Sequence, residues 1–282
     1  MFILGLLTVM LFFFTACKSS PAVDTPPPTL VFNDIEAENP EKLSLYFSLE
    51  LENPFPVDIS AVIDSWQVEI NDRRAPLGFS LEHPALLEIS GSLSVPLRLD
   101  MDIAALARAG LAPADDYRVN LILSLELSGN SRAPVPSGKL EVSSLAEFPG
   151  VRAPEFTITS IAILKAELVN TGFRLGLRIV NPNPYSVNLS ALSYVLYGNG
   201  RRWADGLERK IGSVPGKSAL QGHLVLGMNF IDMGRDLFDQ IVNLVDVNYR
   251  FAGNAIVTTG VDYLPSFDSG FDLSGYSIVL PD

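Results

Sequence analysis

The side chains in this sequence that could perform nucleophilic or acid–base chemistry are few and widely separated. The chain of 282 residues has one cysteine, Cys17, and two histidines, His83 and His223. A serine hydrolase brings together a serine, a histidine and an acid, but the sequence has no Gly-x-Ser-x-Gly turn to present such a serine. His83 precedes a proline, and His223 lies in an alternating, strand-like segment. We therefore expect structural roles for both histidines, no catalytic residue and no enzyme activity.

Metal and cofactor sites are not favoured either. A single cysteine excludes a thiolate cluster or a cysteine-rich zinc site. Asp268 and Asp272 lie close in sequence, but they lack the dense spacing of oxygen ligands in a calcium loop. The sequence thus predicts no resident metal and no cofactor.

The charge and composition of the chain limit its partners and its domain number. Acidic residues outnumber basic ones by 32 to 20, which gives a formal net charge of −12. This charge repels phosphate backbones, so we expect no nucleic-acid partner. Hydrophobic residues make up 48% of the chain and charged residues 18%, which is typical of folded rather than disordered proteins. At this length we expect two domains.

Cys17 follows a segment that has the layout of an export signal. Residues 2–14 are almost wholly apolar, and this stretch is shorter than the roughly 20 residues of a membrane-spanning helix. Ala16-Cys17 resembles the lipobox of bacterial lipoproteins, although Phe14 stands where that pattern has leucine. The resemblance implies a signal peptide over residues 1–17, acylation of Cys17, and an anchor on the extracytoplasmic side of the bacterial cell envelope. The alternative is an apolar leader with an incidental cysteine.

Residues 18–29 are rich in serine, proline and alanine, which is typical of a flexible or partly extended tether. The tether would hold the folded part of the chain away from the membrane. The membrane, reached through acylated Cys17, is therefore the first expected partner.

The rest of the sequence repeats itself. Asn53-Pro54-Phe55-Pro56 recurs 128 residues later as Asn181-Pro182-Asn183-Pro184. Further matches at this spacing are Ser65 with Ser193, Trp66 with Tyr194, Asn71 with Asn199, and Arg73-Arg74 with Arg201-Arg202, while Tyr117 matches Tyr249 at a spacing of 132. An ordered series of matches indicates a tandem duplication. We place the units at residues 30–148 and 156–282, with a linker over residues 149–155.

Each unit has the pattern of an all-β domain. Residues 43–51 and 173–179 alternate apolar and polar side chains, and turn residues separate these and the other alternating runs. The pattern predicts two tandem β-sandwiches of the immunoglobulin or fibronectin-III type. Each unit also has one short helical segment, over residues 103–109 after Asp102 and over residues 233–245 after Asp232.

The Asn-Pro repeat resembles a known family hallmark. Residues 180–189, with Asn181-Pro182-Asn183-Pro184, a strand carrying Tyr194, and Gly206, resemble the late-embryogenesis-abundant type 2 family, also known as the water-stress and hypersensitive-response domain. Asn53, Pro54 and Pro56 belong to a diverged copy in which Phe55 replaces the second asparagine. The resemblance implies a folded sandwich with a protective, non-catalytic role under desiccation or other stress. It also implies lipid handling in some members.

Two sets of residues are candidate sites in these units. The asparagines and prolines of the repeat favour a defined strand crossover, so we expect an architectural role for them, with ligand contact by Asn181 and Asn183 as the alternative. The second set follows two predicted hairpin turns and consists of Arg73, Arg74, Arg201, Arg202 and Trp203. These tips are candidates for contact with anionic headgroups or another protein. The alternative is solvated tips with Trp203 packed against the sandwich.

These observations lead to three hypotheses for function. The first is a non-enzymatic, membrane-anchored module for desiccation or envelope stress protection, or for protein or envelope interaction. The second is an extracytoplasmic carrier of lipid or another apolar ligand, which would need a continuous apolar cavity. The third is a hydrolase, for which the sequence offers no constellation of residues.

Overall fold

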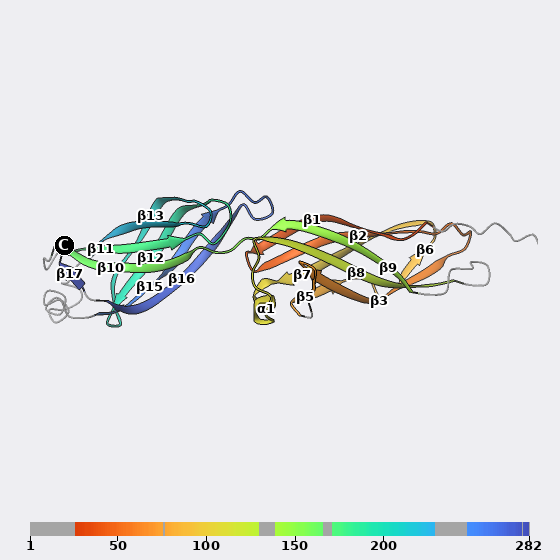
Figure 1. The fold of residues 1–282 in the computed structure, drawn as a ribbon, viewed down its shortest axis with the longest axis horizontal. Helices are drawn as coiled ribbons and strands as arrows, with labels where there is room; N and C mark the ends of the chain where they lie inside the picture. The colour runs from red at the N-terminus through yellow and green to blue at the C-terminus, as the bar shows by residue number, and fades with distance from the viewer. Residues whose placement is uncertain are drawn as a thin grey trace, which may run out of the picture.

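The computed structural model describes residues 26–281 of this chain, except residues 76, 130–138, 166–170, 229–246 and 278. Two β-sandwiches lie end to end along the long axis of the molecule (Figure 1). The expected signal peptide with Cys17, most of the expected tether, and the expected helix over residues 233–245 lie outside the described residues.

The first sandwich packs two sheets against each other. One sheet has the order β1-β2-β7-β5, with β1 at Thr29–Asn39, β2 at Lys42–Glu52, β7 at Ser92–Asp102 and β5 at Phe79–Glu82. The other has the order β4-β3-β8-β9, with β4 at Arg73–Arg74, β3 at Ile59–Ile70, β8 at Asp116–Ser128 and β9 at Lys139–Pro149; β6 at Leu87–Ile89 also pairs with β3. All of these pairings are antiparallel.

The second sandwich repeats this arrangement. One sheet has the order β14-β11-β10-β17, with β14 at Ala219–Met228, β11 at Thr171–Val180, β10 at Glu155–Lys165 and β17 at Val279–Pro281. The other has the order β13-β12-β15-β16, with β13 at Arg201–Val214, β12 at Val187–Gly198, β15 at Val247–Thr258 and β16 at Ser266–Ser277. The order β10-β11-β14 corresponds to β1-β2-β7, and β13-β12-β15-β16 corresponds to β4-β3-β8-β9. The predicted all-β class is confirmed, and the division of strands between two sheets is that of immunoglobulin-like sandwiches.

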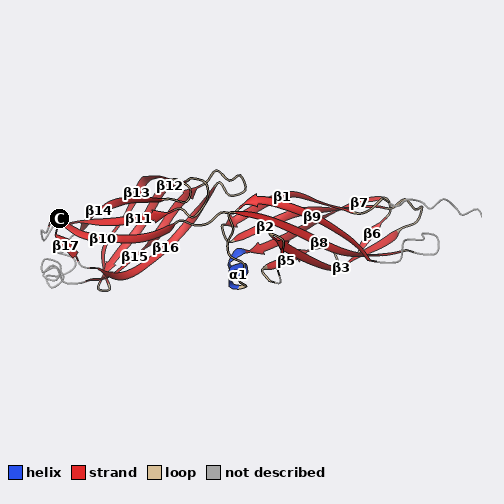
Figure 2. Ribbon diagram, viewed as in Figure 1, coloured by secondary structure: helices blue, strands red, loops and turns tan. Residues whose placement is uncertain are grey.

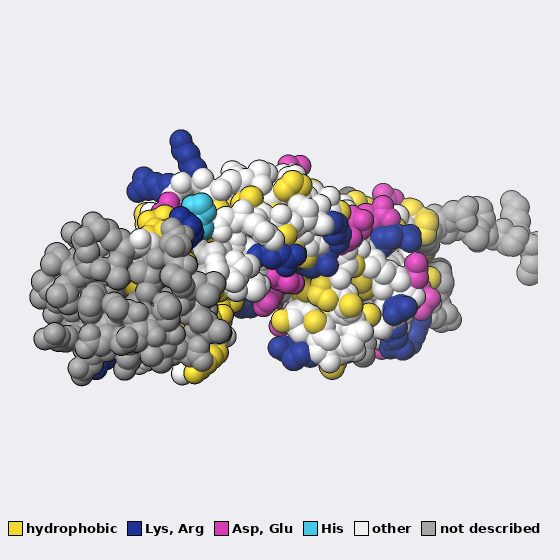
Figure 3. All heavy atoms as spheres, turned by 60° about the vertical axis from the view of Figure 1, so that its left-hand side comes forward, with side chains coloured by type: hydrophobic (Ala, Val, Ile, Leu, Met, Phe, Trp, Pro, Cys, Tyr) yellow, Lys and Arg dark blue, Asp and Glu magenta, His cyan; other side chains and the backbone are white. Residues whose placement is uncertain are grey.

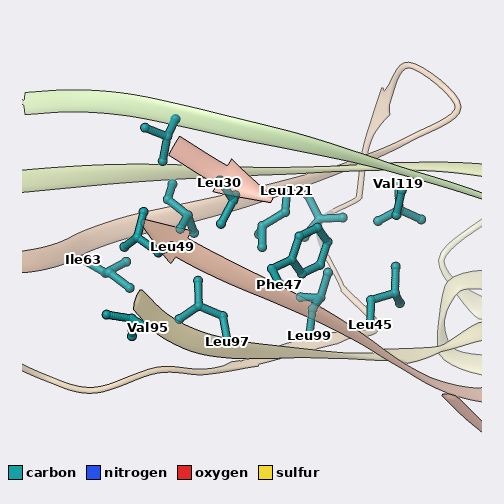
Figure 4. Packing of buried hydrophobic residues seen from close by; sticks show 14 of the residues in the cluster. Leu30, Leu45, Phe47, Leu49, Ile63, Val95, Leu97, Leu99, Val119 and Leu121 are labelled. Atoms are coloured by element: carbon teal, nitrogen blue, oxygen red, sulfur yellow. The ribbon is translucent and has the colours of Figure 1, made fainter. Parts of the chain in front are cut away.

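Alternation along the strands creates a separate core in each sandwich. In β2, the side chains of Leu43, Leu45, Phe47, Leu49 and Leu51 all point inward and are at most 5% exposed. They meet side chains from β7 and β8 between the sheets (Figure 4). In the second sandwich, β11 turns Phe173, Leu175, Leu177 and Ile179 inward in the same way. Burial of these aliphatic and aromatic side chains is the main favourable term in folding each sandwich.

The helix expected in the first unit is present. Helix α1 spans Ile103–Arg108, and the Asp102 carboxylate accepts a hydrogen bond from the Ala105 N–H at 2.7 Å, which caps its first turn. It lies at the end of the first sandwich that faces the second (Figure 2).

The two matching hairpins have the same local geometry. Asn71 and Asp72 have φ angles of 48° and 63°, and Asn199 and Gly200 have 49° and 77°, as two-residue turns of this kind require. The Asn71 side chain accepts from the Arg118 N–H at 2.9 Å, and the Asn199 side chain accepts from the Asn248 N–H at 3.1 Å. Arg118 therefore corresponds to Asn248, and the sequence match of Tyr117 with Tyr249 is wrong by two residues.

Candidate functional site

The first asparagine of each repeat is a buried backbone clamp. Asn181 is 0% exposed, and its Nδ2 donates to the Tyr185 carbonyl at 2.7 Å and the Val214 carbonyl at 3.0 Å. Its Oδ1 accepts from the Asn183 N–H at 3.0 Å. The side chain thus links the end of β11 to the crossover that follows it and to the end of β13. Buried backbone groups without hydrogen-bond partners cost free energy, so these hydrogen bonds stabilise the crossover.

Asn53 makes the same set of contacts in the first sandwich. Its Nδ2 donates to the Val57 carbonyl at 2.9 Å and to the Ile89 carbonyl at 2.6 Å, and its Oδ1 accepts from the Phe55 N–H at 3.0 Å. In both copies the amide donates to the carbonyl four residues ahead and accepts from the N–H two residues ahead. The donors and acceptors of both side chains are directed at the protein's own backbone, not at a ligand.

The second asparagine, Asn183, holds the segment that enters the second sandwich. It is fully buried, and its Nδ2 donates to the Arg152 carbonyl while its Oδ1 accepts from the Arg152 N–H, both at 2.8 Å. Its own carbonyl accepts from the Lys217 N–H at 2.8 Å. The first unit has Phe55 at this position.

The prolines of the repeat fix the crossover and leave carbonyl groups free to accept. Proline has a restricted φ and no N–H, so it cannot extend a paired central strand. The Pro182 carbonyl accepts from Arg152 Nη2 at 2.6 Å and from Lys217 Nζ at 2.8 Å. A Cβ on Gly216 would lie 2.2 Å from the Pro184 carbonyl oxygen, so the crossover also packs closely on the following loop. Pro54 and Pro56 occupy the matching places in the first sandwich.

The same region forms a polar junction between the sandwiches. Asp115, which precedes β8 in the first sandwich, accepts hydrogen bonds from Arg152 Nη2 and from Lys217 Nζ, the latter at 2.6 Å. Acidic and basic side chains gather at the waist of the molecule (Figure 3). This ion-paired group, Asp115, Arg152 and Lys217, connects the first sandwich, the linker and the second sandwich.

Two tyrosines of the second sandwich also bind the linker backbone. The Tyr185 hydroxyl donates to the Gly150 carbonyl at 2.8 Å, and the Tyr263 hydroxyl donates to the Pro149 carbonyl at 2.5 Å. The Tyr263 ring meets the Phe148 ring edge-on at 5.8 Å between centroids. Gly150 is required here, since a Cβ would lie 2.2 Å from the Ala114 carbonyl oxygen.

The environment of the junction shifts the pKa values of three of these groups. The hydrogen bond from Lys217 lowers the pKa of Asp115, and the charge of Arg152 adds to this effect. Burial raises the pKa of Tyr185 to about 12 and also raises the pKa of Tyr263. At neutral pH the junction therefore has an ionised aspartate and two protonated phenols that can donate.

The arginines of the hairpin tips lie on the surface, but Trp203 does not. Arg73, Arg74, Arg201 and Arg202 are exposed, and Arg202 pairs with Asp205 at 2.7 Å. Trp203 is only 3% exposed and stacks on Phe173 at 5.7 Å. Its indole occupies the space beside Gly198, where a Cβ would lie 1.9 Å from the ring. Trp203 is thus a core residue, and its assignment as a surface-contact residue is wrong. The two arginine tips belong to different sandwiches and do not form one site.

The remaining polar candidates are not brought together. His83 lies in an exposed loop of the first sandwich, with Nδ1 3.0 Å from the Pro84 carbonyl oxygen, and His223 lies on the outer face of β14 in the second. Asp272 forms a two-point ion pair with Arg250 at 2.7 and 2.8 Å, which also lowers its pKa. Within the described ranges, no group of three or more histidine, cysteine, aspartate or glutamate side chains could hold a metal ion.

Sequence reasoning missed the junction residues Asp115, Arg152, Lys217 and Tyr263. They come from three loops and the linker, far apart in the chain, and none belongs to the repeated motif. The one available signal was the Asn-Pro-Asn motif itself, since Asn183 lies at the centre of their contacts.

Replacing Asn181 with alanine should destabilise the second sandwich by about 3 kcal/mol, because the loss leaves buried carbonyls and an N–H without partners. In a Trp66→Phe background, Trp203 is the single tryptophan, so its fluorescence follows chemical unfolding of the second sandwich. Asn188→Ala, at an exposed position of β12, is the matched control and should change stability by less than about 0.5 kcal/mol. Equal effects of the two substitutions would contradict the clamp.

The hydrogen bond from Tyr185 to the linker should be lost only in strong alkali. Its pKa is raised above the ordinary value of 10.0, so the protonated donor persists below pH 10 and disappears as the pH rises through about 12. Absorbance titration of the phenolates in the wild type and in Tyr185→Phe should differ by one step near pH 12. A difference step near pH 10 would show that this phenol is not buried at the junction.

A comparison with known protein families matches the segment that carries the Asn-Pro-Asn motif. The family model described as "Late embryogenesis abundant protein" matches residues 176–265, which include Asn181 and Asn183. No curated protein sequence matches the chain.

Solved structures give weaker likenesses. A solution structure of a protein from Arabidopsis thaliana has 17% identity and a TM-score of 0.39, and the match covers 48% of this chain and 87% of that one. A crystal structure of a protein from Archaeoglobus fulgidus has 19% identity and a TM-score of 0.26, with 44% and 97% covered. A Bacteroides uniformis β-glucuronidase has 10% identity and a TM-score of 0.24, with 82% and 26% covered. Residues 176–265 of the second sandwich thus match the late-embryogenesis-abundant family whose hallmark the Asn-Pro-Asn motif resembles.

Proposed function

We propose that this protein is a non-enzymatic, membrane-anchored module of the bacterial cell envelope that protects or binds other envelope components, with two late-embryogenesis-abundant domains in tandem. The observation that carries the proposal is the use of the family motif. The motif's asparagine side chains form hydrogen bonds with the protein's own backbone, at Asn53, Asn181 and Asn183. The motif therefore builds a rigid scaffold. The function then belongs to the outer surfaces of the two sandwiches.

The shared strand order supports the first sandwich as a diverged copy of the second. The paired asparagine hairpins at Asn71 and Asn199 make equivalent hydrogen bonds, and Asn53 and Asn181 make equivalent clamps. Two similar bodies on one anchor present two surfaces, which favours avidity in weak contacts.

The anchor is proposed from the sequence around Cys17. Two or more acyl chains give durable attachment to a bilayer. Within the described residues, no helix has both the length and the apolar character needed to cross a membrane. Pro26, Pro27 and Pro28 line a pocket with Leu51 and Ile59, at the end of the first sandwich opposite the junction. A tether that starts there would place the second sandwich farthest from the membrane.

A role as a carrier of apolar ligands has less support. The apolar pocket beside Pro26–Pro28 has a volume of about 170 Å³, below the roughly 300–1,000 Å³ of small-molecule sites. The inward side chains of β2 and β11 fill the space between their sheets and are almost fully buried. Dense packing of this kind favours the scaffold over the carrier.

Anchoring is tested by Cys17→Ser. The wild-type chain should partition with membranes and the detergent phase, and intact-mass analysis should show an added lipid group. Cys17→Ser should lose the added mass and leave the detergent phase. Identical partitioning and mass of the two proteins would contradict acylation at Cys17.

The protective role is tested by drying a labile enzyme with the purified full chain. The enzyme should keep more activity than with the same mass of serum albumin, in proportion to the amount added. At a temperature above the unfolding midpoint of the Asn181→Ala variant, this variant should protect the enzyme less than the Asn188→Ala variant does. Protection no better than albumin would contradict this role, and stoichiometric lipid in native mass spectrometry would favour the carrier instead.

A further inference from the structure

A large groove runs along the outer face of the sheet formed by β1, β2, β7 and β5. Its volume is about 1560 Å³, above the usual range for small-molecule pockets. Loops of the second sandwich close one end, through Tyr185 and residues 260–263. The groove is therefore formed partly by the junction, and its volume is large enough for a peptide segment.

One wall of the groove is the edge of β1, and this edge differs from the corresponding edge of β10. In the second sandwich, β10 lies between β11 and β17, and β17 pairs with it in parallel from Ile161 opposite Val279 to Ile163 opposite Pro281. In the first sandwich, β1 is the terminal strand of its sheet, with β2 as its neighbour among the described residues. Among the described residues, the same sheet position thus has a second neighbouring strand in one copy and none in the other.

The connection between the sandwiches explains the difference. After β16 the chain continues as β17, which pairs with β10 in parallel. After β9, the corresponding strand, the chain enters the linker, and Val151 is already buried in the second core. The segment that would pair with β1 has been used to join the two bodies, so the edge at Asp34–Glu38 faces the groove.

The edge of β1 has the chemistry of an open strand with an acidic rim. Ile35 and Ala37 are half-buried against the core of the first sandwich, and Ala37 also packs against the core of the second. Asp34, Glu36 and Glu38 alternate with them and are exposed. The Ile35 N–H donates to its neighbour's carboxylate, Asp34 Oδ1, at 2.8 Å, so a side chain takes the place of a strand carbonyl. A backbone edge of this kind is a template for strand addition.

The charges around the groove select the incoming segment. Six carboxylates line it, from Asp34, Glu36, Glu38, Asp100, Asp102 and Asp262, against two basic side chains, Lys42 and Arg98. Arg98 pairs with Asp100 at 2.9 Å, and Lys42 lies 4.0 Å from Glu38. The groove retains an excess of four negative charges, which is complementary to a basic segment.

We propose that the groove binds an extended, lysine- or arginine-bearing segment of a partner protein, which pairs with β1 by parallel strand addition as β17 pairs with β10. Alternate aliphatic side chains of the segment cover Ile35 and Ala37, and the basic side chains between them meet the acidic rim. Peptide binding at this groove does not depend on the membrane anchor or on stress protection. The binding proposal and the proposed function can therefore fail separately.

The test uses fluorescence anisotropy with the full chain in detergent and a labelled synthetic peptide that alternates lysine and valine. This peptide should bind, and a peptide that alternates glutamate and valine should not. The double variant Glu36→Lys/Glu38→Lys should bind the basic peptide about tenfold more weakly. The control Glu88→Lys/Glu141→Lys, at exposed positions of the opposite sheet, changes the net charge equally and should bind like the wild type.

A second peptide separates strand addition from simple charge attraction without any change in the protein. Methylation of alternate backbone nitrogens keeps the charges and removes the N–H groups that pair with a strand, so binding should fall about tenfold or more. Unchanged binding of the methylated peptide, or equal loss in both double variants, would overturn the proposal. Concentration-dependent dimers of the protein that Glu36→Lys/Glu38→Lys abolishes would also overturn it, because a second copy would then occupy the edge.

Discussion

The structure depends on satisfying buried backbone groups at the point where the chain leaves one sheet and crosses to the other. Asn181 supplies two amide hydrogens and an acceptor at this point, and they bind the Tyr185 and Val214 carbonyls and the Asn183 N–H. Asn53 repeats these contacts in the first sandwich. An apolar side chain would leave these groups unpaired, and an aspartate could not donate to the carbonyls. The clamp therefore requires asparagine, and the following proline keeps the chain from extending the strand.

Small changes to one repeated plan account for the differences between the two bodies. The second unit has Asn183, which holds the linker at Arg152, at the position where the first unit has Phe55. In the second unit the chain continues after β16 as β17, which pairs with β10. In the first unit the chain after β9 enters the linker, and Val151 is buried in the core of the second sandwich. The first change contributes to a polar, ion-paired junction, and the second leaves an unpaired acidic edge. Both features lie at or beside the place where the two sandwiches are joined.

Most of the local structure could be predicted from the sequence, while contacts between distant loops could not. The strict alternation in residues 43–51 predicted β2, and Asp102 indicated the start of α1. Asn71-Asp72 predicted the hairpin turn after β3. Each of these patterns acts over only a few residues. The burial of Trp203 depends on the space above Gly198, and the ion-paired group around Asp115 depends on two loops and the linker, which meet only after folding. The sequence match between β8 in the first unit and β15 in the second was wrong by two residues, because loop lengths change without altering the pattern of the strands.

Amide-resolved hydrogen exchange at Phe55 and Asn183 is the most direct test of the buried clamps. Both N–H groups lie in loops outside the strand ladders, and both donate to an asparagine side chain. We expect both amides to exchange as slowly as the amides of the adjacent strands β2 and β11. Exchange at the rate of an unfolded chain would mean that the asparagines do not hold the crossovers, and it would contradict the account.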